Sequence, residues 1–422
     1  MNSRADTLAP VTLITGAAQV VTCAGRHGVG LIENGVIAIE DETILAVGSR
    51  DDVMSALGDR GIQPLDANGG AVIPGYVDCH THLIFAGDRR HEYFARMRGL
   101  DDAGLRAAGI PFDVPVSIAA NRELSVDELV NASLPRLRRM LESGTTTLET
   151  KSGYGLTPDS DIRSLRAARR LAELLPVEIV SSYLGAHVLP PGATKERFLD
   201  EILNEGLPQV SSQGLAEFCD VYCDPHVFDL KETERVLRRA SDLGLRLKLH
   251  VDAKNNIGGT RLAAEMGAVS CDHVNHTTTA DFRALADAGT VAVTFPGFDF
   301  IVNHSSPTSI QAVRDSGVTL ALGTDQCPVC WLESMQLAVA LGCRINRMTP
   351  EESLRGATIH AAAALGLAHR IGSLEPGKQA DIVILDVPSF EQAAFRFATN
   401  SVAKVIKKGR VVVDRGAAAP PG

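Results

Sequence analysis

Residues 72–90 read VIPGYVDCHTHLIFAGDRR, and this stretch decides how the rest of the chain is interpreted. An apolar run that ends at Val77 leads into a polar segment with histidines at positions 80 and 82. Side chains at positions i and i+2 of a β-strand point to the same side, so His80 and His82 share one side. Two neutral imidazoles on one side can bind the same metal ion. The stretch therefore predicts a buried strand that ends in part of a metal site.

Similar apolar stretches recur downstream, separated by amphipathic helical patterns such as KETERVLRRASDLG, which ends in glycine, a usual helix stop. The later strand-like stretches are TTTLET, VEIVSSYLGA, LAEFCDVYC, LRLKLHV, AVSCDHV, TVAVTF and VTLALGTD. Buried strands that alternate with helices imply a parallel sheet, and eight of them suggest a (β/α)8 barrel of the TIM type. An open doubly wound sheet is the alternative. No G-x-G-x-x-G motif follows the first strand, which argues against dinucleotide binding.

Both ends of the chain are β-rich, with VTLITGAAQVV and GVIAIEDETILAVG near the start and ADIVILDV and VAKVIKKGRVVV near the end. Each end is small for an independent domain, and chain termini often lie close together. We therefore predict that residues 1–74 and 372–422 form one small β-sandwich domain. Residues 75–371 would then form the barrel.

Composition narrows the class of protein. The 422 residues carry a formal net charge of −10 without a Lys/Arg stripe, so no nucleic-acid partner is expected. No run of about 18 apolar residues exists, which predicts no membrane span. Asp6 and Pro10 interrupt any export-signal layout, so the expected location is the cytoplasm. The eight cysteines are scattered, which makes a disulfide framework improbable.

Polar residues fall at the carboxyl ends of the predicted strands, which is the catalytic face of a barrel. His250 ends the fifth strand and Asp325 follows the eighth. A single histidine there is usually structural, and a single Thr-Asp pair is usually a helix cap. Their combination with His80 and His82 supplies three nitrogens and one oxygen. That set suits Zn²⁺ or Fe²⁺ and leaves a position for water.

Two more histidines and a pair of cysteines also lie at or just after the carboxyl ends of predicted strands. His187 ends the third strand and is a candidate for substrate binding, while His273 ends the sixth and could hold a carbonyl oxygen or the attacking water. Both also fit a structural role. Cys327 and Cys330 form a C-x-x-C just after Asp325, and no second C-x-x-C supports a structural zinc site. Cys327 is therefore a candidate substrate contact, the alternative being that both cysteines simply pack.

Taken together, these motifs resemble the imidazolonepropionase family within the amidohydrolase superfamily. The first-strand stretch and ETKSGYGL at the second strand carry the resemblance, which covers roughly residues 10 to 415. Further matching stretches are LGAHVLP, HVDAKNNIGG, GTVAVTFPG, ALGTD, RMTPEESLRGATI and GSLEPGKQADIVILDVPS. KSGYGL and the C-terminal stretches are more specific to the subfamily than H-x-H or GTD.

The resemblance implies a hydrolase, expected to be a homodimer, that binds one metal ion and opens the ring of 4-imidazolone-5-propanoate. The product would be N-formimino-glutamate, in histidine breakdown. Arg89 matches the arginine that meets the substrate carboxylate, a task that suits a guanidinium fork. The other residues carried over are the metal ligands His80, His82, His250 and Asp325, the substrate contacts Tyr154 and His187, and the catalytic-site histidine His273.

Several positions depart from the family pattern. The family usually has a glutamate three residues after the strand-five histidine, where this chain has Ala253. Help from a general base is often worth about 10²–10⁴ in rate, so this is a chemical change. A substrate-contacting tyrosine is replaced by Asp102. The expected glycine run reads AGIP at residues 108–111, and the turn after Asp325 reads QCPVC.

Three functions therefore compete. The first is imidazolonepropionase activity. The second is a sibling hydrolase for a related carboxylate-bearing ring, such as a hydantoin or the 2-thioxo-imidazolone propanoate of ergothioneine breakdown, or more distantly a cyclic amidine deaminase. The third is a metal-binding barrel without activity. In either enzyme, Asp325 would act as ligand and base, His273 or the metal would stabilise the oxyanion, and Arg89 would favour a carboxylate-bearing substrate.

Overall fold

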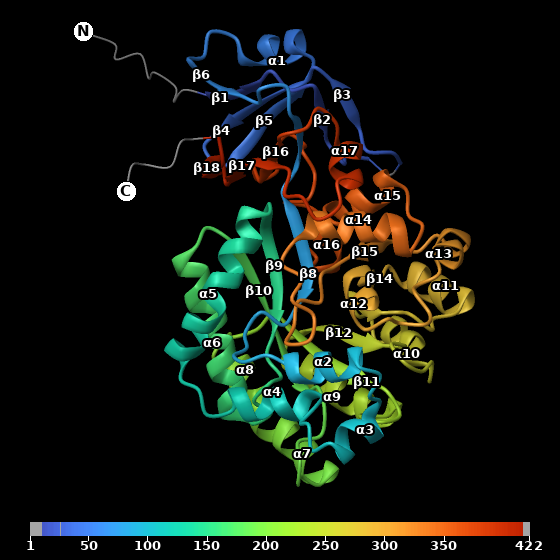
Figure 1. The fold of residues 1–422 in the computed structure, drawn as a ribbon. Coiled ribbons are helices and arrows are strands. Elements are labelled where there is room, and N and C mark those ends of the chain that lie inside the picture. Colours follow the sequence, from blue (N-terminus) through green and yellow to red (C-terminus); the bar gives the residue numbers. More distant parts are fainter. Residues whose placement is uncertain (1–10, 26, 417–422) are drawn as a thin grey trace, which may run out of the picture.

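The computed structural model of the chain describes residues 11–25 and 27–416, which form a barrel and two mixed β-sheets (Figure 1). The prediction that the chain has no export signal rests largely on residues 1–10, which lie outside the described residues. The outer ends of the predicted small domain, at residues 1–10 and 417–422, lie outside them as well.

Eight consecutive strands form one parallel sheet in chain order, as the alternation of apolar and amphipathic stretches predicts. The strands are β8 (Tyr76–Thr81), β9 (Thr145–Lys151), β10 (Glu178–Ala186), β11 (Phe218–Cys223), β12 (Arg246–Val251), β13 (Ser270–His273), β14 (Val291–Thr294) and β15 (Leu320–Leu322). Nearly every residue of these strands is buried, because helices cover the outer face and side chains fill the inner one. The predicted (β/α)8 fold class is confirmed.

Backbone hydrogen bonds just beyond the last strand close the barrel. The Asp325 amide donates to the His80 carbonyl at 3.1 Å, and the His82 amide donates to the Gln326 carbonyl at 2.8 Å. Since these bonds join the carboxyl ends of the first and eighth strands, they also place Asp325 beside the two histidines of the H-x-H motif.

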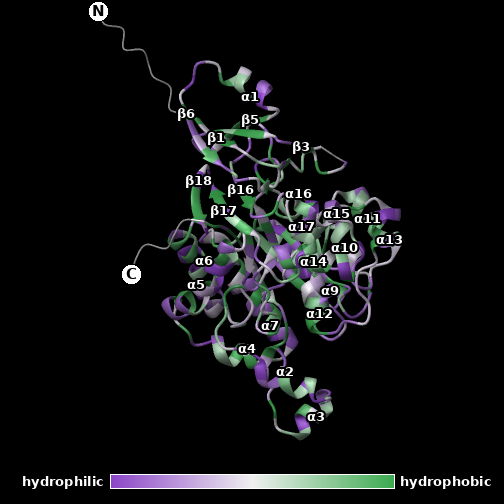
Figure 2. Ribbon diagram, turned by 45° about the horizontal axis from the view of Figure 1, so that its top comes forward, coloured by the Kyte–Doolittle hydropathy of each residue, from purple (hydrophilic) through white to green (hydrophobic). Residues whose placement is uncertain are grey.

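Helices surround the barrel (Figure 1), and three short ones lie in the loop after β8. Those three are α2 (Arg90–Met97), α3 (Asp102–Ala107) and α4 (Val114–Asn121). The others are α5 (Val126–Glu142), α6 (Pro158–Leu174), α7 (Lys195–Glu201), the π-helical turn η1 (Ile202–Gly206), α8 (Leu207–Ser212), α9 (Leu230–Asp242), α10 (Gly259–Glu265), α11 (Thr279–Ala288), α12 (Pro296–Ile301), α13 (Ile310–Ser316), α14 (Met335–Ile345), α15 (Pro350–Gly356) and α16 (Ile359–Ala364). Hydrophobic and hydrophilic residues alternate along many of them (Figure 2), as expected for helices that pack one face on a sheet.

The two ends of the chain meet in the mixed sheets. One sheet has the order β5-β4-β1-β6 and the other has the order β18-β17-β16-β7-β2-β3. The N-terminal elements are β1 (Val11–Thr15), β2 (Gln19–Val21), β3 (Leu31–Glu33), β4 (Val36–Glu40), β5 (Thr43–Gly48), α1 (Arg50–Leu57), β6 (Ile62–Asp66) and β7 (Ala71–Pro74). The C-terminal elements are β16 (Ile382–Leu385), α17 (Phe390–Phe395), β17 (Val402–Lys407) and β18 (Arg410–Asp414).

A shared apolar core joins these sheets, with Val20, Val72 and Ile382 among its members. Strand β16 pairs antiparallel with β7, so the C-terminal segment completes a sheet that the N-terminal segment begins. The exact domain boundaries stay a prediction.

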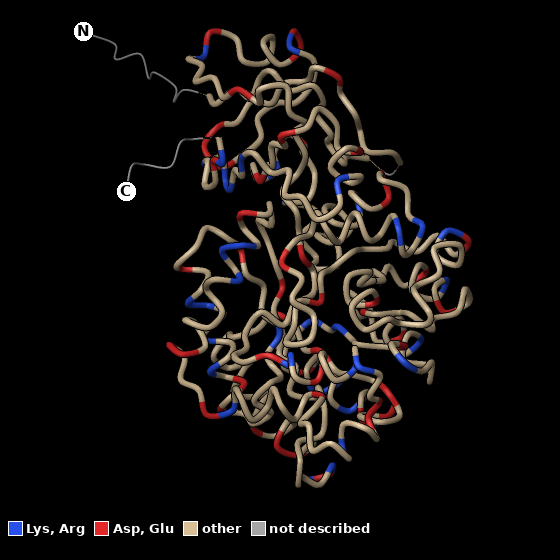
Figure 3. Tube along the Cα trace, in the orientation of Figure 1, with Lys and Arg blue, Asp and Glu red and all other residues tan. Residues whose placement is uncertain are grey.

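Charged residues of both signs are interspersed along the chain trace (Figure 3). Among the described residues, no helix combines the length and the apolar character needed to cross a membrane. All eight cysteines are free.

Candidate metal centre and substrate pocket

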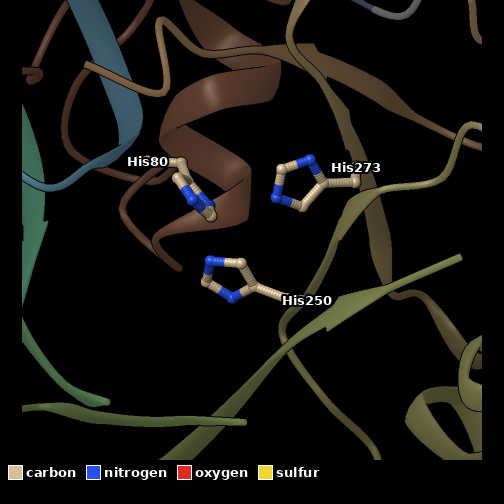
Figure 4. A group of neighbouring side chains, drawn as sticks. All are labelled: His80, His250 and His273. Atoms are coloured by element: carbon tan, nitrogen blue, oxygen red, sulfur yellow. The ribbon is translucent and has the colours of Figure 1, made fainter. Parts of the chain in front are cut away.

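The four predicted metal ligands converge at the carboxyl ends of β8, β12 and β15. The Nε2 atoms of His80 and His82 each lie 3.6 Å from Oδ1 of Asp325. Ligand-type atoms of these three residues all lie within 4.8 Å of one another. The same holds for His80, His250 and His273, whose rings face one another in Figure 4. His273, predicted to hold a carbonyl oxygen or the attacking water, thus belongs to a second possible ligand group that shares His80 with the first.

Hydrogen bonds orient two of the imidazoles. His80 Nδ1 lies 2.6 Å from Asp272 Oδ2, and His250 Nδ1 lies 3.0 Å from Asp220 Oδ1. An ionised carboxylate only accepts, so both Nδ1 atoms carry the proton and both Nε2 atoms carry a lone pair. Within the described part of the chain, these Nε2 atoms are buried and have no hydrogen-bond partner. Metal-ligating histidines have this arrangement, so the residues present fit a metal ion.

The electrostatics of the cluster also suit a cation. Burial lowers the pKa of His80, His82 and His273 well below the usual value, which keeps the imidazoles neutral and able to bind a metal. Burial raises the pKa of Asp325 well above its usual value. A nearby divalent ion favours the ionised form of such a carboxylate. The buried His/Asp cluster is therefore consistent with a divalent metal ion.

Two residues of the cluster have an unusual backbone. Asp325 has φ = 48° and His273 has φ = 87°, in the left-handed region that residues other than glycine seldom adopt. Such conformations persist where the surrounding structure holds them, and they concentrate at functional sites. At Asp325 the hydrogen bond to the His80 carbonyl is part of that support.

A cavity of about 610 Å³ opens onto the candidate metal ligands and His273, which are together called the metal cluster. Its lining includes four metal-cluster residues, the four predicted substrate contacts and two of the positions that depart from the family. The metal-cluster residues are His82, His250, His273 and Asp325. The predicted substrate contacts are Arg89, Tyr154, His187 and Cys327, and the two departing positions are Asp102 and Ala253. The structure thus brings every predicted substrate contact to one space, while the role of each stays a prediction.

Arg89 stands at the cavity wall, held by acidic side chains. Its Nε and Nη2 atoms donate to the two carboxylate oxygens of Glu92 at 2.7 and 3.0 Å, and Asp113 lies 3.5 Å away. Burial opposes ionisation of Glu92, yet Arg89 lowers its pKa below the usual value. Glu92 therefore fixes the direction of the guanidinium, which sequence reasoning did not anticipate.

The KSGYG motif positions His187 and Tyr154. His187 Nδ1 lies 3.0 Å from the Gly153 carbonyl, which only accepts, so Nε2 is free to accept a hydrogen bond. Gly153 has φ = 109°, and a Cβ there would lie 2.8 Å from the Leu184 carbonyl oxygen, so the turn requires glycine. The Tyr154 ring lies 5.5 Å from the His187 ring. The motif thus places a phenol and an imidazole acceptor on the cavity wall.

The C-x-x-C forms a tight turn after Asp325. Cys327 and Cys330 exchange backbone hydrogen bonds of 2.9 and 3.0 Å, and both side chains are buried. Burial raises the pKa of each, so both are thiols. Cys327 lines the cavity, whereas the Cys330 thiol donates to the Thr324 carbonyl.

Sequence reasoning missed a group of charged residues beneath the metal cluster. They are Glu149, Lys151, Asp220, Lys248 and Asp272, all of them buried inside the barrel. The signal was present in the sequence, since each is a charged residue within or at the end of a stretch otherwise typical of a buried strand.

These features define the class of protein: a parallel eight-stranded barrel with histidines and an aspartate at the carboxyl ends of its strands. Residues 71–412 match the model of the amidohydrolase family, and the chain belongs to this family. Within the family it is imidazolonepropionase-like. It is 40% identical to the imidazolonepropionase of Symbiobacterium thermophilum over 417 residues, covering 96% of this chain and 97% of the relative. It is also 40% identical to that of Geobacillus kaustophilus over 415 residues, covering 95% and 97%.

A solved structure supports the fold. The N-isopropylammelide isopropylaminohydrolase of Burkholderia multivorans superposes with a TM-score of 0.70, covering 97% of this chain and all of that one. The two sequences are 21% identical, so this likeness concerns the fold alone.

Proposed function

We propose that this protein hydrolyses 4-imidazolone-5-propanoate to N-formimino-glutamate with one divalent metal ion, Zn²⁺ or Fe²⁺. The observation that carries the proposal is the shared cavity, where Arg89 and the cluster of His82, His250 and Asp325 line one space. A cation for the propanoate arm and a metal centre for the ring are the two features such a substrate needs. Relatives that are 40% identical over nearly the whole chain are named imidazolonepropionases.

Each residue of the site has a distinct role in the proposed reaction. His80, His82, His250 and Asp325 would hold the ion, which when bound lowers the pKa of water and polarises a carbonyl. Asp325 accepts the proton of the attacking water and returns it to the ring nitrogen as the carbon–nitrogen bond breaks. His273 donates a hydrogen bond to the oxygen on which negative charge develops.

The remaining contacts orient the substrate. Arg89 binds the propanoate carboxylate through the part of its fork that Glu92 leaves free. His187 accepts a ring N–H through Nε2, and Tyr154 and Cys327 complete the wall of the cavity. With alanine at position 253, Asp325 carries more of the proton transfer.

A second candidate is a sibling hydrolase for a related ring that bears a carboxylate, such as a 2-thioxo-imidazolone or hydantoin propanoate. The observation that favours it is that Asp102, Ala253 and Cys327, three departures from the family pattern, line the same cavity. Changes at these three positions would alter which ring fits while the catalytic scaffold stays the same.

Purified, metal-loaded protein offered each ring in turn would decide between these functions, with products identified by mass spectrometry. Formation of formimino-glutamate from the imidazolone is the expected result. Consumption of an analogue without turnover of the imidazolone would move the assignment to the second candidate. Absence of turnover on every ring would leave the inactive metal-binding barrel.

We further propose that the protein is a homodimer in the cytoplasm. The resemblance to imidazolonepropionases that are 40% identical over nearly the whole chain supports both the dimer and the location. Sedimentation equilibrium of the full chain would test the dimer, and a single species at monomer mass would refute it.

A further inference from the structure

Two lysines and three carboxylates form a fully buried ionic network directly beneath the metal cluster. Glu149, Lys151, Asp220, Lys248 and Asp272 have side chains with no solvent exposure. Burying five ionisable side chains is costly unless each charge has a partner. The proposed function uses none of these residues to bind or transform a substrate, so their presence inside the barrel needs another explanation.

Lys151, at the end of β9, lies at the centre of the network. Its Nζ is 2.7 Å from Asp220 Oδ2, 2.8 Å from Glu149 Oε1 and 3.9 Å from Asp272 Oδ2. Asp220 uses its other oxygen to accept the Nδ1 proton of His250. A continuous path therefore runs from the ammonium through one carboxylate to a candidate metal ligand.

A second path begins at Asp272. Its Oδ2 atom accepts the Nδ1 proton of His80 at 2.6 Å and lies 3.5 Å from Lys248 Nζ. Its Oδ1 atom accepts a hydrogen bond from Ser270 at 2.6 Å. Asp272 is thus held by more than one neighbour, whereas Asp220 depends on Lys151 for its only other short polar contact that the described structure records.

The ammonium also stands where a cation is needed. Ligand-type atoms of His80, Asp220 and Asp272 lie within 4.8 Å of one another, a grouping that could hold an ion. Lys151 already occupies a position beside both carboxylates. Burial alone would lower the pKa of Lys151, but Asp220, Glu149 and Asp272 raise it above its usual value, so the side chain is a permanent cation.

We infer that Lys151 is a positioning residue of the metal centre, which holds the Asp220 carboxylate so that it fixes the imidazole of His250 and directs Nε2 toward the ion. This inference rests on the metal centre of the proposed function. Carboxylates that orient metal-binding histidines typically contribute 10–100-fold to metal affinity. Lys151 acts one step further out, by holding such a carboxylate in place.

The direction of the change in metal affinity on removal of Lys151 distinguishes a positioning role from a purely electrostatic one. Lys151 repels a divalent ion, so by Coulomb's law alone its removal would strengthen metal binding. If Lys151 positions Asp220, its removal weakens binding, because Asp220 can turn away and release the His250 ring. The two explanations therefore predict opposite changes.

The test compares wild type, Lys151→Met and the matched control Lys407→Met. Lys407 is another buried lysine, 2.7 Å from Asp381, but its partners lie outside the metal cluster. Each apoprotein is titrated with Zn²⁺ against a chromophoric chelator, and the visible spectrum of its Co²⁺ form is recorded. We expect Lys151→Met to bind Zn²⁺ at least about tenfold more weakly, with an altered Co²⁺ spectrum. Lys407→Met should match wild type in both.

A double variant covers the case in which Lys151→Met fails to fold. Lys151→Met/Glu149→Gln removes one charge of each sign, so the buried net charge is unchanged while Asp220 still loses its ammonium. We expect the same tenfold loss of affinity. Zn²⁺ binding as tight as wild type or tighter, in whichever variant folds, would overturn the inference. A wild-type protein that binds no ion would instead overturn the metal centre itself.

Discussion

At the scale of single residues, the unusual feature is how much depends on Asp325. Its Oδ1 atom lies 3.6 Å from the Nε2 atoms of both His80 and His82. The backbone of Asp325 is in the left-handed region, and its amide donates a hydrogen bond to the His80 carbonyl of β8. Position 253, where the family resemblance predicts a glutamate, is alanine and lines the same cavity. In the proposed mechanism, one carboxylate therefore serves both the metal and the proton.

Replacing Asp325 by asparagine should lower turnover by about 10²–10⁴, since the amide cannot accept the proton of the attacking water. Turnover is measured on protein whose metal content is determined in the same sample. The matched control is Asp287→Asn, an exposed aspartate on α11, which should leave turnover unchanged. Near-normal turnover by metal-loaded Asp325→Asn would rule out Asp325 as the base.

Replacing Arg89 by lysine should raise KM about 10- to 100-fold, because a charge-assisted hydrogen bond of roughly 1.5–3 kcal/mol is lost while the charge remains. Steady-state kinetics with the propanoate substrate and with its carboxamide analogue measure this. Wild type should prefer the carboxylate strongly and Arg89→Lys should not. The neighbouring Arg90, 65% exposed in its side chain, supplies the control Arg90→Lys. Equal effects of the two variants would contradict a direct contact at Arg89.

At the scale of elements, the KSGYG turn and the start of α6 form one unit. Asp161, in the first turn of α6, accepts a hydrogen bond from the Gly153 amide at 3.1 Å. Gly153 in turn accepts from His187, so a helix terminus, a turn and a strand end are linked. Burial raises the pKa of Asp161 from 3.8 to about 7.

This raised pKa predicts a pH dependence of stability. Between about pH 4 and pH 7 the folded state holds a proton on Asp161 that the unfolded state has lost, so the contribution of Asp161 to stability falls as pH rises through this window. The slope is at most about 1.4 kcal/mol per pH unit. Urea unfolding of wild type and Asp161→Asn across the window should show that the variant lacks this decline. Asp159→Asn, exposed on the same helix, should behave like wild type. Parallel curves for wild type and Asp161→Asn would be inconsistent with a protonated Asp161.

At the scale of the whole molecule, the metal cluster joins strands that are far apart in the sequence. His80 lies in the first strand and His82 directly follows it, His250 belongs to the fifth and Asp325 follows the eighth. Asp78 strengthens the same closure, because its carboxylate accepts hydrogen bonds from the Thr324 amide and hydroxyl at 3.0 and 2.6 Å. An ion bound there would help to hold the barrel closed at the carboxyl ends of its strands.

Removal of the ion should therefore lower the Tm of the protein. A ligand that binds only the folded state stabilises it by about 2.7 kcal/mol at a free concentration one hundred times its Kd. Calorimetry with and without a chelator measures the shift, and added Zn²⁺ should restore the Tm. The variant His250→Ala should respond much less to either reagent. A wild-type Tm that ignores the chelator would argue against a metal that joins these strands.

The sequence by itself determined the order of the barrel strands and the residues at their carboxyl ends. Periodicity is local, and in a parallel barrel every strand end lies at the same edge, so His80, His82, His250, His273 and Asp325 could be grouped without a structure. The pairing of the two chain ends in one sheet also followed from their β-rich character. The roles of the individual side chains did not follow from the pattern, because periodicity gives the position of a residue and not its contacts.

Only the tertiary structure decided which side chains meet inside the barrel. The ion pair of Lys151 with Asp220 and the hydrogen bonds from His250 to Asp220 and from His80 to Asp272 connect different strands. The clamp of Glu92 on Arg89 depends in the same way on the conformation of an irregular loop. Such contacts depend on strand register, barrel closure and rotamer, and these are set by the packing of the whole core. A charged residue within a buried strand signals that a partner exists, but the folded barrel alone determines which partner it is.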